Sequence, residues 1–259
     1  MEKSRLRLAN DNEQEVLAEL GDLPLDLASL VCSYALGAES PPKLFMIAAA
    51  DGEEWGARWL AREYSLTTTD ARANTNCALR FACESGHLGV AKWLVAAFGL
   101  TATDARILDN DALCSACGSG HLNVAQWLIA TFDLTAADAR AGNCYALAAA
   151  CEAGHLEVAQ WLVATFDLTA ADARADDNYA LYETCRNGHL NVVQWLVRSV
   201  GLTSADVRAN NCRALRYARG HHCITDWLMD EFAGLHMPND EDNESENDEG
   251  DGADSADEC

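Results

Sequence analysis

Three groups of residues have the side-chain types and the spacing that catalytic, redox or metal-binding sites require. Cys114 and Cys117 form a C-x-x-C pair, as in redox motifs and zinc sites. Asp and Arg recur as Asp-Ala-Arg, as at Asp138 and Arg140, which could pair two catalytic groups. Histidine recurs at regular intervals and could suggest a metal array; its positions are His87, His121, His155, His189 and His221.

A structural role explains each of these groups better than catalysis does. Cys117 belongs to a repeated column with Cys83, Cys151 and Cys185, and a lone cysteine pair supplies only two of the four ligands that zinc needs. Asp and Arg at i and i+2 do not face each other on a helix, so we expect ion pairs between neighbouring repeats. Each histidine opens a second helix, where satisfying the turn is the expected role. With no G-x-S-x-G, P-loop or G-x-G-x-x-G motif, we predict no enzymatic activity, no metal and no cofactor.

The elements that position these residues repeat every 34 residues. Gly-His, Asp and Arg columns share this period, and a tryptophan column follows it until a last step of 32. The tryptophans, which we expect to hold the stack of repeats together, are Trp59, Trp93, Trp127, Trp161, Trp195 and Trp227. Several columns with one period indicate a repeat architecture.

One repeat can be read from residue 144 to residue 177. Residues 145–153 are rich in alanine and predict a short helix, and Gly154 suits a left-handed helix end. Residues 155–166 place apolar side chains on one stripe at helical spacing, which predicts a second helix. One helical hairpin cannot bury both of its faces, so stacked copies must form a solenoid.

The segment A-L-x-x-A-C-x-x-G-H-L-x-V-A-Q-W-L-V resembles the ankyrin repeat, across residues 43–234. The long G-H-L-x-V-A-Q-W-L runs are similar to ankyrin proteins of giant viruses of amoebae and of some protists. The resemblance implies that the chain binds a partner protein on the concave face made by first helices and connectors. It brings no catalytic residues.

The sequence departs from the family pattern in two places. The first helices lack the family's T-P-L-H opening, and Asn76, Asn110 and Asn178 stand where they could cap these helices. The connectors read T-x-x-D, as at Thr135 and Asp138, which is a variant capping box. We therefore expect a short helical turn in place of the family's β-fingers.

These patterns predict an all-α, ankyrin-like solenoid of about six stacked helical hairpins. The array covers residues 43–236, with units that start near residues 43, 76, 110, 144, 178 and 212. Residues 1–18 are expected to be a flexible N-terminus. Residues 237–259 are expected to be a disordered acidic tail, because residues 238–259 carry 11 acids, no base and no large apolar anchor.

Residues 19–42 allow two interpretations. Leu27, Leu30, Val31 and Tyr34 have the spacing of a short amphipathic helix that would cap the first repeat. The stretch that begins at Leu23-Pro24 also resembles the opening of an F-box. In that case residues 19–36 would recruit a ubiquitin-ligase adaptor, and the chain would be a substrate receptor.

Charge and cysteine content limit the partners and the compartment. The net charge of −23 disfavours nucleic acid and anionic membranes, and no apolar run is long enough to span a bilayer. Eleven cysteines without a visible secretory signal indicate reduced thiols inside the cell. We expect an intracellular, cytoplasmic monomer, located in the host cytoplasm if the source is viral.

The candidate binding residues are those that differ between repeats, because faithfully repeated columns are needed for packing. First-helix positions hold large side chains of the types that dominate interfaces. The predicted partner-binding residues are Arg80, Phe81, Tyr145, Tyr179, Tyr182, Glu183, Arg186 and Tyr217. We expect them to be exposed, with the best patch at residues 145–186.

Overall fold

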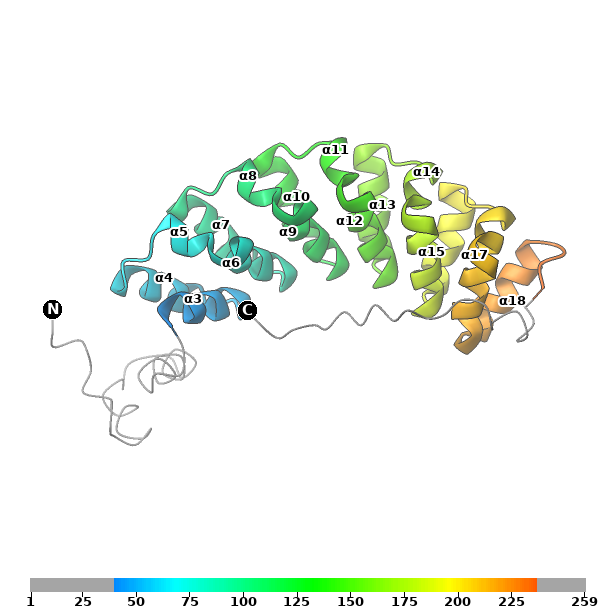
Figure 1. Cartoon of the computed structure of the whole chain (residues 1–259), viewed down its shortest axis with the longest axis horizontal. Helices are drawn as coiled ribbons and strands as arrows, with labels where there is room; N and C mark the ends of the chain where they lie inside the picture. Colours follow the sequence, from blue (N-terminus) through cyan, green and yellow to red (C-terminus); the bar gives the residue numbers. More distant parts are fainter. Residues whose placement is uncertain (1–39, 237–259) are drawn as a thin grey trace, which may run out of the picture. The chain divides into compact units, whose positions relative to one another are not determined.

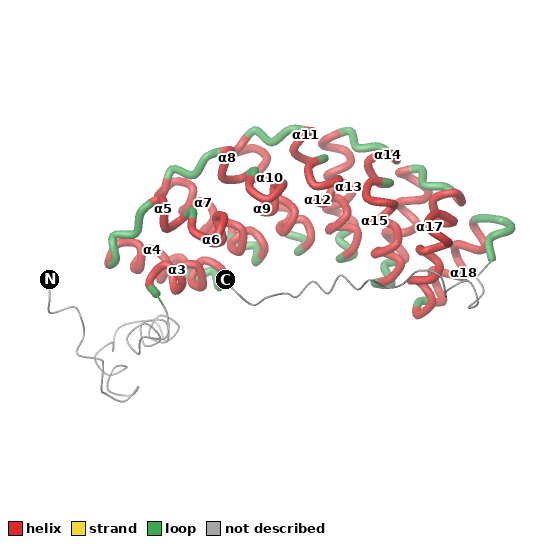
Figure 2. Tube along the Cα trace, in the orientation of Figure 1, coloured by secondary structure: helices red, strands yellow, loops and turns green. Residues whose placement is uncertain are grey.

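The computed structural model describes residues 40–236, which are helical with no strand among them (Figures 1 and 2). They fall into two compact units, divided between Leu108 and Asp109. The predicted segment 1–18, residues 19–39 of the predicted segment 19–42, and the tail 237–259 lie outside the described residues. No described helix is long and apolar enough to cross a membrane.

The first unit contains the first two helical hairpins and the connectors that follow them. Its helices are α3 (Pro41–Ala50), α4 (Glu54–Glu63), α5 (Thr68–Ala71), α6 (Ala73–Glu84), α7 (Leu88–Phe98) and α8 (Ala102–Ala105). Pro41 and Pro42 occupy the first turn of α3, where a missing N–H costs nothing. Helix α3 therefore begins two residues before residue 43, near which the first repeat was predicted to start.

The second unit continues the same pattern of hairpins and short connector helices. Its elements are α9 (Ile107–Gly118), α10 (Leu122–Phe132), α11 (Ala136–Ala139), α12 (Ala141–Glu152), α13 (Leu156–Phe166), α14 (Ala170–Ala173), α15 (Ala175–Arg186), α16 (Leu190–Trp195), the π-helix η1 (Leu196–Val200), α17 (Ser204–Tyr217), the 3₁₀ turn η2 (Ala218–Gly220) and α18 (His222–Glu231). Helix α9 starts two residues before the division. The α12, α15 and α17 helices pack side by side as the first helices of successive repeats.

Two leucine columns form the core of the repeats. One lies on the first helices, as at Leu147 and Leu181, and the other directly follows the tryptophans, as at Leu162 and Leu228. All four side chains are almost completely buried. Because the columns come from both helices of each hairpin, stacking buries the faces that one hairpin leaves open.

The short connector helices begin with the capping box that the sequence predicted. The Thr135 backbone N–H and hydroxyl both donate to Oδ2 of Asp138, at 2.7 and 2.9 Å. The same box opens α5, α8, α14 and α17. The prediction of a helical turn in place of a β-finger is confirmed.

A left-handed turn joins each connector to the following first helix. In α12, Gly142, Asn143 and Cys144 have φ values of 54°, 57° and 61°. The predicted helix-capping role of the asparagines is wrong, because Asn76 and its equivalents are the third residues of such turns. The amide of Asn76 instead donates to the backbone oxygen of Asp104, at 3.0 Å.

Candidate protein-binding surface

Four tyrosines from three successive first helices form a continuous row, which we call the tyrosine row. Tyr145 lies on α12, Tyr179 and Tyr182 on α15, and Tyr217 on α17. The ring centroids are separated by 6.2 Å from Tyr145 to Tyr179, 5.3 Å from Tyr179 to Tyr182, and 5.6 Å from Tyr182 to Tyr217. The last pair is stacked, with 25° between the ring planes. The structure thus brings together the four tyrosines among the predicted partner-binding residues.

Two arginines contact the rings at the Tyr217 end of the row. The guanidinium carbon of Arg213 lies 3.9 Å from the centroid of Tyr182 and 5.3 Å from that of Tyr217. The guanidinium carbon of Arg186 lies 5.7 Å from the centroid of Tyr217. A planar cation over an aromatic face is attracted by the ring quadrupole, so both arginines are positioned by the rings they cover.

Two acidic side chains contact the residues of this surface. The Tyr179 hydroxyl donates to Oε2 of Glu152, at 3.0 Å. Burial, and then the negative charge of Glu152, raise the pKa of Tyr179, so this hydroxyl stays protonated and available as a donor. Nη1 of Arg186 lies 3.3 Å from both carboxylate oxygens of Glu183.

Exposure differs along the row and corrects part of the sequence prediction. Tyr145 is 45% exposed and Tyr217 is 38% exposed, as expected for contact residues. Tyr182 and Glu183 are each only 6% exposed, so the expectation that they are exposed is wrong. Tyr182 is covered by its aromatic neighbours and by Arg213, and it contacts Tyr179 and Tyr217 inside the row.

The predicted contact residues of the first unit form a pair of their own. The guanidinium carbon of Arg80 lies 5.9 Å from the centroid of Phe81, and its Nε donates to the backbone oxygen of Thr75 at 3.0 Å. Both side chains are half-buried. They lie on α6 and are not members of the tyrosine row.

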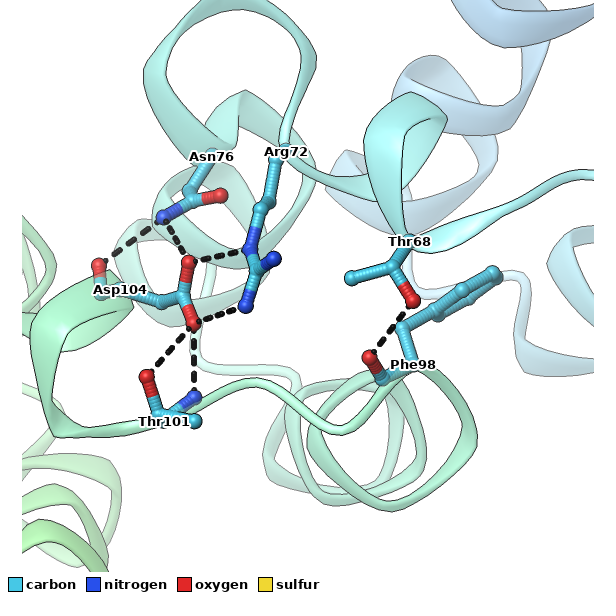
Figure 3. Close-up of polar contacts among 6 residues, drawn as sticks. All are labelled: Thr68, Arg72, Asn76, Phe98, Thr101 and Asp104. Carbon is cyan, nitrogen blue, oxygen red and sulfur yellow. Dashed lines mark hydrogen bonds and ion pairs between the residues drawn. The ribbon is translucent and has the colours of Figure 1, made fainter.

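The connectors fix the spacing of the first helices through ion pairs between neighbouring repeats. Arg72 reaches Asp104 with Nε to Oδ1 at 2.7 Å and Nη2 to Oδ2 at 2.9 Å, while Thr101 caps the same carboxylate (Figure 3). Figure 3 also shows the Asn76 amide on Asp104 and the Thr68 hydroxyl donating to the Phe98 carbonyl. The predicted pairing between repeats is confirmed.

The second unit repeats this contact next to the tyrosine row. Nε of Arg140 lies 2.6 Å from Oδ1 of Asp172, and Nε of Arg174 lies 2.6 Å from Oδ1 of Asp206. The Arg140 hydrogen bond lowers the pKa of Asp172 to about 2 despite partial burial. Because these pairs tie the connector before α12 to the one before α15, and that one to the start of α17, they set the spacing between the tyrosines.

The glycine-histidine turns form the opposite junction between repeats. Gly154 has φ +79°, and a Cβ atom there would lie 2.5 Å from Nδ1 of His189 in the next repeat. Gly188 meets His221 in the same way, and Nε2 of His221 lies 2.9 Å from the backbone oxygen of Arg186. The histidines therefore pack against the preceding turn, in agreement with the predicted structural role.

The tryptophan column is half-buried and is not the fully buried core column. Trp127 meets Phe132 edge to face, at 6.1 Å between ring centroids. Complete burial belongs instead to the leucine that follows each tryptophan, such as Leu128. The role of the tryptophans in holding the stack of repeats together therefore stays a prediction.

The cysteine column lies inside the first helices. Cys83, Cys117, Cys151 and Cys185 are completely buried. Burial raises the pKa of Cys114 to about 12 and raises that of Cys117 further, so both thiols are protonated at neutral pH. No group of three or more potential metal ligands occurs within residues 40–236.

Arg213 is the member of this surface that the sequence prediction left out. It occupies the same first-helix column as Tyr145 and Tyr179, two positions before the repeated leucine. The change from tyrosine to arginine along one column was the available signal. Its contact with Tyr182 depends on the packing of α17 against α15, which one repeat alone does not reveal.

Comparison with known proteins decides the family. The model for ankyrin repeats (3 copies) matches residues 44–139, 97–172 and 147–239. The chain belongs to the ankyrin repeat family. Among solved structures, it is similar to an ankyrin repeat family protein from Legionella pneumophila, with 16% identity, a TM-score of 0.40, and coverage of 89% of this chain and 88% of that one. No curated protein matches the sequence.

Proposed function

We propose that this ankyrin repeat chain is a non-catalytic scaffold that binds a partner protein through the tyrosine row on the first helices of its second unit. Ankyrin repeats generally serve as modules for interaction between proteins. The observation that supports this site is the contact between tyrosines of three successive repeats, with Tyr145 and Tyr217 open to solvent at its two ends. Tyrosine gives a large contact area at a low cost in side-chain entropy.

The positions of the row also favour binding over packing. The column that holds Tyr145 and Tyr179 contains Cys77 and Asp111 in earlier repeats, whereas the position two residues later is leucine in every repeat after the first. The stack therefore does not require an aromatic side chain in this column. Tyr182 and Arg213 hold the Tyr217 ring, and Tyr179 contacts the Tyr145 ring, so both exposed rings are preorganised and lose less entropy on binding.

The test uses the full chain as bait in a eukaryotic cell lysate. Tyr145→Ala with Tyr217→Ala removes the two exposed rings and leaves the buried Tyr182 in place. We expect at least a tenfold weaker capture of the bound protein, because such anchors contribute about 2 kcal/mol or more each. The matched control is Trp55→Ala on α4, an aromatic side chain that is 53% exposed outside the row.

The result has two clear outcomes. Loss of a protein with the tyrosine variant and its retention with the tryptophan variant would support the site. Equal capture of the same proteins by both variants would overturn it. Far-UV circular dichroism of each variant confirms that the helices are retained.

The substrate-receptor alternative rests on residues 19–36 and on the F-box-like sequence that begins at Leu23-Pro24. Leu23→Ala with Leu27→Ala tests it without shortening the chain. Deletion of residues 1–42 is unsuitable, because Pro41 and Pro42 belong to α3. Ubiquitin-ligase adaptor and cullin captured by the parent chain and lost from this variant would favour the alternative over a simple scaffold.

A further inference from the structure

Two neighbouring segments of the chain carry opposite charge. Residues 207–225, which include most of α17, contain four arginines, two histidines and no acid. Residues 238–259 contain 11 acids and no base. Other stretches without acids are as long, but none of them contains as many arginines, and this one is followed within about a dozen residues by the most acidic part of the sequence.

The basic segment contributes to a formed surface, which we call the arginine–tyrosine cluster. It consists of Arg186, Arg213, Tyr182 and Tyr217. Arg213 is held over Tyr182 at 3.9 Å, and the Arg186 side chain is 59% exposed. The carboxylate of Glu183, whose side chain is 8% exposed, offsets one of the two positive charges. Asp176 also acts electrostatically on Tyr182, so the attraction rests on the guanidinium groups of Arg186 and Arg213, whose geometry suits carboxylates.

We propose that the acidic segment 238–259 binds the arginine–tyrosine cluster of its own chain and covers the Tyr217 end of the tyrosine row. This occupant is favoured by opposite charge and by tethering. The described chain ends at His236, shortly after α18, which follows α17 in the same unit. Twenty-two residues span up to roughly 70 Å when extended, whereas the 14 residues of α17 would span less than about 50 Å even if extended, so the segment is long enough to reach the cluster.

Tethering makes weak contacts effective. A segment joined by a short linker has an effective concentration in the millimolar range, so a few carboxylate–guanidinium contacts are enough to occupy the cluster. The contact requires only side-chain charge, and it weakens as salt screens exposed charges. The inference goes beyond the proposed function, because it adds an internal competitor that a partner must displace.

The test needs no partner protein. The receptor is the full chain with its 11 tail acids replaced by Asn and Gln, and the probe is a peptide of residues 237–259 carrying a fluorophore on Cys259. We expect the peptide to raise fluorescence anisotropy with the neutral-tail chain and to bind at least tenfold more weakly to the parent chain, whose own tail occupies the cluster. Binding should fall severalfold between about 50 and 300 mM NaCl.

Matched variants locate the contact. Arg186→Gln with Arg213→Gln in the neutral-tail chain should reduce peptide affinity at least tenfold. Arg58→Gln with Lys92→Gln removes the same charge from exposed positions on α4 and α7 and should leave affinity unchanged. If the double variant Arg186→Gln with Arg213→Gln unfolds, the single variants Arg186→Gln and Arg213→Lys distinguish the effect of lost charge from the effect of lost folding.

Three results would overturn the proposal: no peptide binding to the neutral-tail chain, equal binding to the parent chain, or equal losses in the two double variants. Because the assay contains only this chain and its peptide, these results leave the binding of another protein by the tyrosine row untouched. Failure of the lysate test would likewise leave the tail contact intact.

Discussion

Gly154 must satisfy two requirements that no amino acid other than glycine meets. Its φ of +79° is a left-handed conformation, and the His189 ring of the next repeat occupies the space where a Cβ atom would lie. Gly201 shares the first requirement with φ +90°, but has no atom within 4 Å of a built Cβ. Comparing substitutions at the two glycines therefore distinguishes the cost of backbone strain from the cost of disturbing the contact between repeats.

We predict that Gly154→Ala destabilises the chain at least twice as much as Gly201→Ala. The left-handed conformation costs about 1 kcal/mol in both, and forcing the His189 ring aside adds roughly 1–3 kcal/mol in the first. Urea unfolding followed by circular dichroism measures both values. Adding His189→Ala should restore part of the loss in the first variant only; equal losses in the two single variants would show that the ring yields freely.

Asp172 should make stability depend on pH. Its folded pKa of about 2 lies below its ordinary value of 3.8, so its stabilising effect is complete above about pH 5 and is lost as the pH falls toward 2. Asp172→Asn should cost about 2 kcal/mol at pH 6 and almost nothing at pH 2. Urea unfolding across this range measures the difference, and a cost that is constant with pH would contradict the ion pair as its cause.

At the scale of the element, the left-handed turn before each first helix shows a preference for asparagine, aspartate and glycine. Its first position reads Asn74, Leu108, Gly142, Asp176 and Asn210. Leu108 departs from this pattern with φ 51° and a 58% exposed side chain, so it gains little burial in return for its strain.

We predict that Leu108→Asn stabilises the chain by about 0.5–1 kcal/mol, because asparagine tolerates the left-handed region and other repeats already use it. Asn74→Leu is the reverse change in the first unit and should destabilise by a similar amount. Thermal and urea unfolding measure both, and a loss of stability in Leu108→Asn would show that the exposed leucine has a contact of its own.

The same elements show how far the sequence predicts the fold and the site. The 34-residue period, the capping box at Thr135 and the glycine turns follow local rules, so the hairpins and connector helices were predictable. The left-handed turns were not, since Asn76 is as suitable for a helix cap as for this turn. The burial of Tyr182 depends on Arg213 and Tyr217 of the next repeat, and that contact becomes visible only once the first helices are packed together.

At the scale of the whole molecule, stability should depend on each repeat and its neighbours. Leu162 is completely buried in the fourth repeat. We predict that Leu162→Ala costs about 2–5 kcal/mol, and that this loss divides the single urea transition into two, because a weakened central repeat uncouples its neighbours. Circular dichroism and tryptophan fluorescence would then give different midpoints; coincident transitions would indicate that the array unfolds as one block.

The matching junctions make the repeats interchangeable. Arg140 and Arg174 each reach an aspartate 32 residues ahead, and Gly120 and Gly154 each meet a histidine 35 residues ahead. If residues 144–177 were excised, Arg140 would face Asp206 and Gly120 would face His189, so the arginine–aspartate and glycine–histidine contacts could both form again. Gain or loss of one whole repeat by gene duplication or deletion can thus lengthen or shorten the tyrosine row without altering these two kinds of joint.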